Sequence, residues 1–265
     1  MRRVAFINEK GGTCKTTLAV NVAAYFARQK SMKVLLVDLD TQGHAGKSLG
    51  VDVRTVRPNV FHLLSNPKVQ LADCVQPTAV ENLSVIPSYK EMSEFPVAVA
   101  NRADRVNLLA DRFTSEEARG YDAVIFDAPP SMGLTTMNIL VAATEVVIPV
   151  GLTYLSLDGC AELVKTVEDV AEKYGRRDLR VSRVVPTLYR KTALADEILS
   201  KLKDYFPKEL SQTLLGFNVK IDEAQSHGQT IWEYAPASRG AQMLGAIAEE
   251  IHAAGRSAKK ARAVA

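Results

Sequence analysis

Short apolar runs alternate with segments of helical periodicity along the chain. The runs are rich in Val, Ile and Leu and contain few polar residues, which is typical of parallel strands covered on both faces. We expect strands at residues 3–8, 33–40, 82–88, 121–131 (where a turn ends the strand), 145–151 and 180–189, with a further short apolar run at 214–220.

Apolar positions with helical spacing fill the segments between these runs. In the first segment Leu18, Val22, Tyr25 and Phe26 recur on one helical face. Helices are expected over residues 16–29, 102–113, 157–175, 193–206 and 239–254. This alternation predicts an α/β fold with a doubly wound, mostly parallel sheet and helices on both of its faces.

Composition limits the class of protein more than it defines a function. Of the 265 residues, 47% are hydrophobic and 24% are charged, which suits a single globular domain over residues 1–254 rather than a disordered chain. Residues 255–265 contain basic but no acidic side chains, so we expect a flexible basic tail there.

Cysteine, histidine and hydropathy patterns exclude several classes of site. The three cysteines and four histidines lack the spacing of metal ligands, which argues against a structural zinc site and a disulfide framework. No apolar run is long enough for a membrane span, and the N-terminus has no signal-peptide core. We therefore expect a cytoplasmic protein.

The segment between the first strand and the first helix has the character of a phosphate-binding loop. Its residues 7–20 read I-N-E-K-G-G-T-C-K-T-T-L-A-V, which is close to G-x-x-x-x-G-K-[ST]. Glu9 and Cys14 stand where that motif has glycines. Strand, loop and helix nevertheless follow in the order that such a loop requires.

Each residue of the loop has an expected partner on a nucleotide. Backbone N–H groups of the glycine pair and the positive end of the helix would bind phosphate oxygens. Lys15 is expected over the β- and γ-phosphates, Thr16 on Mg²⁺ and Thr17 at the α-phosphate. The predicted nucleotide-binding residues of this loop are Lys10, Gly11, Gly12, Thr13, Cys14, Lys15, Thr16 and Thr17.

Carboxylates follow two of the predicted strands at their carboxyl ends, where open α/β sheets bind ligands. Asp38 and Asp40 have the i, i+2 spacing that places both on one side of a strand. One of them can hold the loop or the metal shell, and the other can position water. Asp127 ends the apolar run A-V-I-F-D, a Walker B geometry, and is expected to bind Mg²⁺ through water.

The stretch K-G-G-T-C-K-T-T resembles the deviant Walker A motif, K-G-G-x-x-K-[ST], of the ParA/MinD family of P-loop ATPases. The residues D-L-D-T-Q resemble the family's D-x-D-P-Q. Residues 221–251 resemble the C-terminal signature of ParA-type partition members, around E-A-P-S-x-G and S-x-G-A. The resemblance thus covers nearly the whole chain.

This resemblance implies that the protein binds ATP and Mg²⁺ and forms a homodimer in the ATP state. In the family the extra lysine, here Lys10, reaches across the dimer interface to the phosphates bound by the other subunit. Lys10, Lys15 and Asp40 are the expected catalytic residues, with Asp40 orienting the attacking water. Thr16, Asp40 and Asp127 are the expected metal-site residues.

Adenine recognition is expected, by resemblance, at the ends of the last strands. The residues concerned are Pro186, Thr187, Phe217 and Asn218. The chain departs from the family at Cys14, where a glycine is usual, and at Thr41, where proline is usual. A lowered thiol pKa is expected for Cys14, because Lys15 and a helix N-terminus lie beside it.

Basic residues between 176 and 220 outnumber acidic ones by ten to five, which suits contact with DNA phosphates without sequence specificity. The resemblance implies a nucleoid-associated partition ATPase whose hydrolysis is stimulated by a ParB-like or cargo-adaptor partner. The candidate DNA contacts are Arg190, Lys191, Lys201, Lys203 and Lys220.

Three other classes remain as alternatives. A MinD-like positioning ATPase would need an amphipathic membrane helix, but G-R-S-A-K-K-A-R-A-V-A at the C-terminus has little apolar area, so we expect no membrane partner. A carrier resembling nitrogenase iron protein would need two cluster ligands per subunit, and Cys74 and Cys160 lack that family's surrounding sequence. A metabolic kinase or ligase would need a pocket for a small acceptor.

Overall fold

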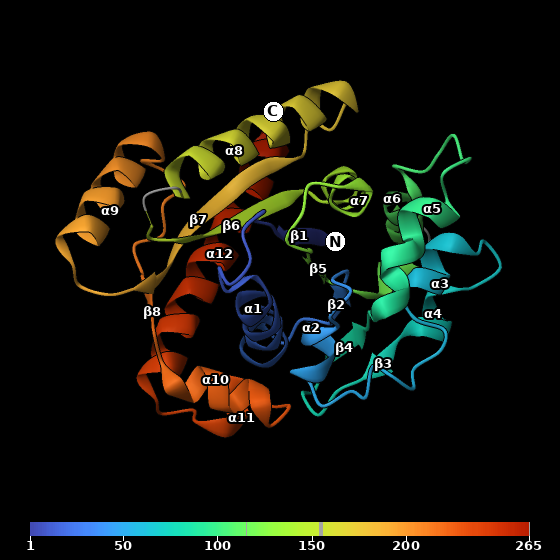
Figure 1. Ribbon diagram of the computed structural model, residues 1–265, viewed down its shortest axis with the longest axis horizontal. Helices are drawn as coiled ribbons and strands as arrows, with labels where there is room; N and C mark the ends of the chain where they lie inside the picture. Colours follow the sequence, from blue (N-terminus) through green and yellow to red (C-terminus); the bar gives the residue numbers. More distant parts are fainter. Residues whose placement is uncertain (115, 154–155, 265) are drawn as a thin grey trace.

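One eight-stranded sheet organises the chain in a computed structural model that describes residues 1–114, 116–153 and 156–264. The strand order is β3-β4-β2-β5-β1-β6-β7-β8, and all pairs are parallel except β3 with β4 (Figure 1). The strands are β1 (Arg2–Phe6), β2 (Val34–Asp38), β3 (Gln76–Pro77), β4 (Leu83–Ile86), β5 (Ala123–Asp127), β6 (Glu145–Gly151), β7 (Arg180–Tyr189) and β8 (Leu215–Gly216).

Helices cover both faces of this sheet, as the sequence predicts. The helices are α1 (Lys15–Lys30), α2 (His44–Lys47), α3 (Val60–Ser65), α4 (Leu71–Cys74), α5 (Phe95–Ala98), α6 (Leu108–Thr114), α7 (Leu134–Ala142), α8 (Ser156–Lys173), α9 (Ala193–Tyr205), α10 (Val219–Ser226), α11 (Ile231–Tyr234) and α12 (Arg239–Val264), with 3₁₀ turns η1 (Lys90–Glu94) and η2 (Glu116–Gly120). None of the described helices is both long and apolar enough to cross a membrane.

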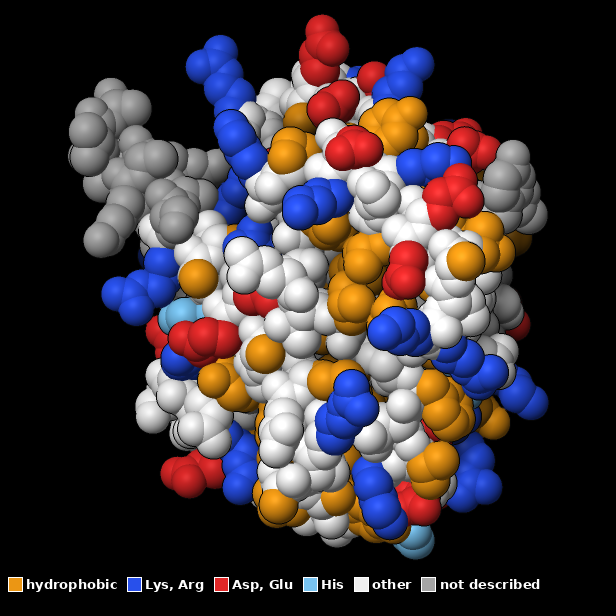
Figure 2. Space-filling view, turned by 90° about the vertical axis from the view of Figure 1, so that its left-hand side faces the viewer, with side chains coloured by type: hydrophobic (Ala, Val, Ile, Leu, Met, Phe, Trp, Pro, Cys, Tyr) orange, Lys and Arg blue, Asp and Glu red, His pale blue; other side chains and the backbone are white. Residues whose placement is uncertain are grey.

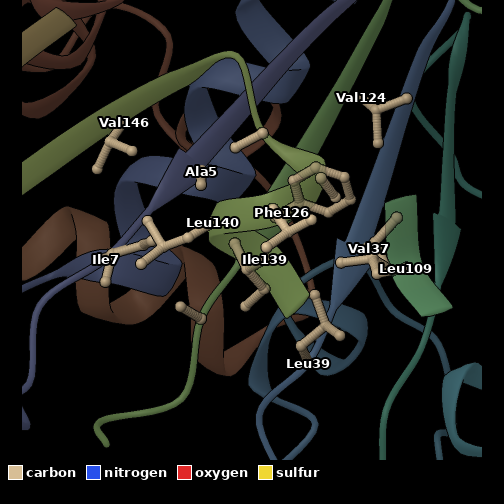
Figure 3. Packing of buried hydrophobic residues seen from close by; sticks show 14 of the residues in the cluster. Ala5, Ile7, Val37, Leu39, Leu109, Val124, Phe126, Ile139, Leu140 and Val146 are labelled. Carbon is tan, nitrogen blue, oxygen red and sulfur yellow. The ribbon is translucent and has the colours of Figure 1, made fainter. Parts of the chain in front are cut away.

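The alternation of side chains along each strand produces two separate cores. In β1, Val4 and Phe6 pack with α1 and α12, whereas Ala5 and the residue directly after the strand, Ile7, face the opposite side of the sheet. Figure 3 shows this second core, in which Ala5 and Ile7 approach Leu140 of α7. Because both faces are covered, the central strands contain few polar residues, and this explains their continuous apolar runs.

The helical and strand predictions differ from the structure mainly where elements are short. The strands β6 and β7 have the predicted bounds, whereas the helix expected over 102–113 begins only at Leu108, because residues 102–107 form successive turns. The run at 214–220 contains only the two-residue β8, since Asn218 already caps α10. The antiparallel edge strand β3 is too short to produce a periodic signal.

The flexibility expected for residues 255–265 stays a prediction. In the structure α12 runs from Arg239 through Val264, so no helix end falls at the expected boundary after residue 254. The residues after Gly255 are mostly Ala, Lys and Arg, which have high helix propensity, so positive charge alone does not end the helix.

A buried arginine joins α12 to the sheet. Arg2 of β1 pairs with both carboxylate oxygens of Glu145 in β6, at 2.9 and 2.7 Å. The same guanidinium donates to the Ile251 carbonyl of α12 at 2.9 Å and lies over the ring of Phe26. A Cβ on Gly255 would lie 2.2–2.4 Å from the guanidinium, so the helix requires a glycine where it passes over Arg2.

We therefore expect Gly255→Ala to lower the free energy of unfolding by about 1–3 kcal/mol, because Arg2 cannot move aside without breaking its pair with Glu145. Gly159→Ala on α8 is the matched control. Nothing lies within 4 Å of a Cβ there. The control should gain up to about 1 kcal/mol from helix propensity in urea unfolding. Equal stability of the two variants would contradict this role of Gly255.

Candidate functional site

The loop from Asn8 to Cys14 connects β1 to α1 at the carboxyl edge of the sheet. Gly12 and Cys14 both have left-handed backbone conformations, with φ of 70° and 65°. A non-glycine residue is strained there, so the glycine that the motif usually has at position 14 has a backbone reason. A Cβ on Gly11 or Gly12 would meet no atom within 4 Å, so the outer surface of the loop is open to a ligand.

Hydrogen bonds to the strands β6 and β7 hold the loop in place. Asn8 donates to the Pro149 carbonyl of β6 at 2.6 Å and accepts from the Lys10 N–H at 2.9 Å. The Thr187 hydroxyl of β7 donates to the Thr13 carbonyl at 3.2 Å. Thr187 was predicted at the adenine, whereas here it supports the phosphate loop. Asn8 was not predicted, because a polar residue at the end of a strand has no distinctive sequence pattern.

The side chain of Lys15 contacts the backbone of Lys10. Lys15 is 7% exposed, and its ammonium donates to the Lys10 carbonyl at 2.9 Å. Burial lowers the pKa of Lys15, while the carboxylates of Asp127 and Asp40 oppose this shift. The side chain of Lys10 is half-buried at the rim of the loop.

Thr16 and Asp127 come together as the sequence predicts for a metal site. The Thr16 hydroxyl donates to Oδ2 of Asp127 at 2.7 Å, and Asp127 is fully buried. Its other oxygen, Oδ1, has no hydrogen-bond partner among the described residues. Burial raises the pKa of Asp127 to about 7, and the Asp40 carboxylate adds to that shift. A buried carboxylate oxygen without a partner, beside a threonine hydroxyl, is suited to a hard cation such as Mg²⁺.

The described residues contain no group of three or more His, Cys, Asp or Glu placed to hold a metal ion. Magnesium in such sites takes only one or two protein ligands, together with water and phosphate oxygens.

Asp38 and Asp40 have different surroundings although they are two residues apart. Asp38 is fully buried, and its carboxylate accepts the N–H groups of Asp40, Ala45 and Gly46 at 3.1, 2.9 and 3.3 Å. Burial, and then the nearby Asp127, raise the pKa of Asp38 well above its usual value. Asp38 thus holds the loop that carries Asp40, while Asp40 is only half-buried and lies near the Lys15 ammonium.

The expected reactive thiol at Cys14 is wrong. Burial raises the pKa of Cys14 to about 11, the carboxylate of Asp222 adds to the shift, and Lys15 only partly opposes it. Asp222 belongs to α10, which packs against the loop from the far end of the sequence. The same helix brings Gln225 to Thr17, where its amide donates to the hydroxyl at 3.0 Å.

The other predicted adenine contacts lie in different settings. Pro186 is buried in β7. Phe217 is 54% exposed, and the guanidinium of Arg190 lies 5.5 Å from the centre of its ring. The Asn218 side chain accepts the Lys220 N–H and so begins α10. Of these residues, Phe217 presents an exposed aromatic face.

The candidate DNA contacts lie after β7, on α9 and at the start of α10. Lys201 pairs with Glu197 at 2.7 Å and Lys220 with Glu223 at 2.8 Å. Lys191 and Lys203 are exposed and have no ion-pair partner in the part of the chain that the structure describes. Figure 2 shows Lys and Arg side chains spread across this side of the molecule among hydrophobic and acidic ones.

Comparisons with known proteins identify relatives of this chain. A family described as an AAA domain matches residues 1–181. The chain is 36% identical over 253 residues to the sporulation initiation inhibitor protein Soj of Bacillus subtilis, covering 95% of this chain and 98% of that one. It is 39% identical over 254 residues to the chromosome-partitioning ATPase Soj of Thermus thermophilus, covering 96% of each chain.

A solved structure resembles the whole chain. It is cobyrinic acid a,c-diamide synthase from Mycobacterium smegmatis with bound ADP and magnesium, with a TM-score of 0.80 and 26% identity. The match covers 94% of this chain and 93% of that one.

The raised pKa of Asp127 predicts how stability depends on pH in the absence of Mg²⁺. The folded chain holds a proton on this carboxyl up to about pH 7, whereas the unfolded chain loses it near pH 4, so stability falls as the pH rises between these values. Asp127→Asn removes this contribution. At pH 8 the variant should be on the order of 1–3 kcal/mol more stable than the wild type, with a smaller difference at pH 5.

Urea unfolding in EDTA at the two pH values measures this effect. Asp204→Asn, on the exposed side of α9, is the control and should change stability by less than about 0.5 kcal/mol at either pH. An Asp127→Asn variant that is less stable than the wild type at pH 8 would show that the carboxylate is well compensated in the folded chain.

Proposed function

The chain belongs to the ParA/MinD family of P-loop ATPases, and from this premise we propose that it is a partition ATPase that dimerises around ATP, binds DNA without sequence specificity and positions a cargo. The observation that carries the proposal is the group of Lys15, Thr16 and Asp127 at the open loop. A buried lysine, a threonine hydroxyl and a carboxylate oxygen that has no partner among the described residues meet where phosphates and Mg²⁺ would be bound.

In this proposal the loop binds the phosphates of ATP. Backbone N–H groups from Gly11 to Cys14 and the N-terminus of α1 donate to phosphate oxygens, and Lys15 exchanges the Lys10 carbonyl for a phosphate. Thr16 and Asp127 hold Mg²⁺, which neutralises phosphate charge when it is bound. Asp40 accepts a hydrogen bond from the attacking water and so orients it.

The second lysine distinguishes this loop from an ordinary phosphate-binding loop. We assign the half-buried side chain of Lys10 to the nucleotide of a second subunit, as the family resemblance implies. The γ-phosphate then completes the interface, because each triphosphate binds ammonium groups from both chains. Hydrolysis removes this contact and separates the dimer, which is the differential contact that any such switch needs.

Non-specific DNA is the proposed surface on which the dimer moves, and a ParB-like or cargo-adaptor protein is the proposed activator. The exposed lysines after β7 and on α9 support contact with phosphates. Names of partition proteins among the relatives support this role over that of a metabolic kinase. The cargo is a plasmid, a chromosome origin or a protein complex.

Substitutions at Lys10 and Asp40 should have opposite effects on the dimer. Lys10→Ala should bind one ATP per monomer but form no dimer with ATP and Mg²⁺. Asp40→Ala should form the dimer and keep it, because hydrolysis is slowed at least about 100-fold when the water is not oriented. Light scattering after gel filtration measures both, and a normal ATP dimer of Lys10→Ala would refute the assignment.

Removing two exposed lysines should weaken DNA binding and its dependence on salt. For Lys191→Ala with Lys203→Ala, the slope of log affinity against log salt should fall by about 2–4, since the dimer loses two lysines from each subunit and each lost phosphate contact contributes about 0.9. Lys33→Ala with Lys68→Ala removes the same charge from exposed positions elsewhere and is the control. Titration of the Asp40→Ala dimer with duplexes of unrelated sequence gives the slopes. Equal slopes for the two double variants would exclude the proposed face.

A further inference from the structure

We propose that Gln225 is a positioning residue for the nucleotide, because its side-chain amide fixes the hydroxyl of Thr17 so that the hydroxyl proton is left for the α-phosphate. The two residues are 208 positions apart in the sequence, and no motif of the phosphate loop includes Gln225. The inference rests on the proposed nucleotide site and adds to that site a residue from the C-terminal part of the chain.

The contact lies in the first turn of α1, next to the metal-site threonine. Gln225 Nε2 donates to Thr17 Oγ1 at 3.0 Å, and both side chains are half-buried. The adjacent hydroxyl of Thr16 is already committed to Asp127 at 2.7 Å. Asp127 therefore accepts a hydrogen bond from the hydroxyl of Thr16 and not from that of Thr17.

The direction of the hydrogen bond decides what the hydroxyl can do. A threonine hydroxyl has one proton to donate and two lone pairs that accept. Because the amide N–H occupies a lone pair, the proton of Thr17 remains for an acceptor, and a phosphate oxygen is an acceptor only. A carboxylate at position 225 would reverse this arrangement. It would accept the hydrogen bond from the Thr17 hydroxyl, and it would bring negative charge toward the phosphates.

Two further hydrogen bonds join this part of the chain to α1 without involving Gln225. The Asn21 side chain of α1 accepts the Ile231 N–H at 3.0 Å, and the Trp232 indole donates to the Asn21 carbonyl at 3.3 Å. These bonds tie α11, directly after α10, to the same helix that carries Thr17. The attachment of α10 and α11 to α1 therefore does not depend on the hydrogen bond between Gln225 and Thr17 alone.

The structure offers a control that separates positioning from mere attachment of α10 and α11. Gln225→Met keeps the length of the side chain and removes the donor. Gln225→Glu keeps the shape and reverses the hydrogen bond. Trp232→Phe removes a different hydrogen bond between the same part of the chain and α1, and leaves Thr17 and Gln225 untouched.

Calorimetric titration of the full chain with Mg·ADP and Mg·ATP tests the inference. Gln225→Met should weaken the binding of both nucleotides equally, by about 3–10-fold, because the α-phosphate is common to them. Gln225→Glu should weaken both by more than about 10-fold. Trp232→Phe should stay within about twofold of the wild type, and kcat of Gln225→Met at saturating ATP should be unchanged while KM rises.

Each outcome decides between the inference and the proposed function. Wild-type affinity in both Gln225 variants would overturn the inference and leave the nucleotide site standing. An equal loss in Gln225→Met and Trp232→Phe would also overturn it, because Gln225 would then serve only to attach α10. A wild-type chain that binds neither nucleotide would overturn the proposed function, and the inference with it.

Discussion

Two carboxylates, Asp38 and Asp127, occupy facing positions at the carboxyl ends of the adjacent strands β2 and β5, and both are fully buried. Two buried negative charges at neighbouring positions destabilise the folded chain unless hydrogen-bond donors or cations compensate them. The surrounding structure supplies those donors. N–H groups in the first turn of α2 donate to Asp38, and the Thr16 hydroxyl donates to Asp127. The Lys15 ammonium, at the start of α1, lowers the pKa of Asp127 and so partly opposes the effect of burial. One oxygen of Asp127 accepts no hydrogen bond from the part of the chain that the structure describes, and the proposed chemistry of the site depends on this oxygen.

This convergence was predictable because it depends on local sequence and on a general property of parallel sheets. A loop motif, two strands that end in aspartate and the rule that such ends share one edge are enough to bring Thr16 to Asp127. The supports of the loop could not be predicted. Asn8, Thr187 and Gln225 act through contacts between distant segments, and a polar residue there has the same local sequence whether it holds a carbonyl or faces water.

Two expectations judged a residue or a segment by its sequence neighbours alone. The pKa of Cys14 was expected to fall because a lysine and a helix N-terminus adjoin it, but burial and Asp222 of α10 have the larger effect. The domain was expected to end at residue 254 because a basic segment follows, whereas α12 continues past Gly255, where it passes over Arg2. Burial and packing depend on the whole fold, so neither follows from local charge.

The helix α10 contributes residues both to the proposed nucleotide site and to the candidate DNA contacts. It has eight residues, with Lys220 exposed near its start and Gln225 bonded to Thr17 near its end. A ligand shifts a conformational equilibrium only through contacts that differ between the two states. If a bound phosphate accepts a hydrogen bond from the Thr17 hydroxyl, the hydrogen bond from Gln225 strengthens, because a hydroxyl that donates becomes a better acceptor. The first turn of α1 and the helix α10, which carries the candidate DNA contact Lys220, are then held together more tightly with nucleotide than without it. The side chains of Thr17 and Gln225 thus couple nucleotide binding to the position of α10.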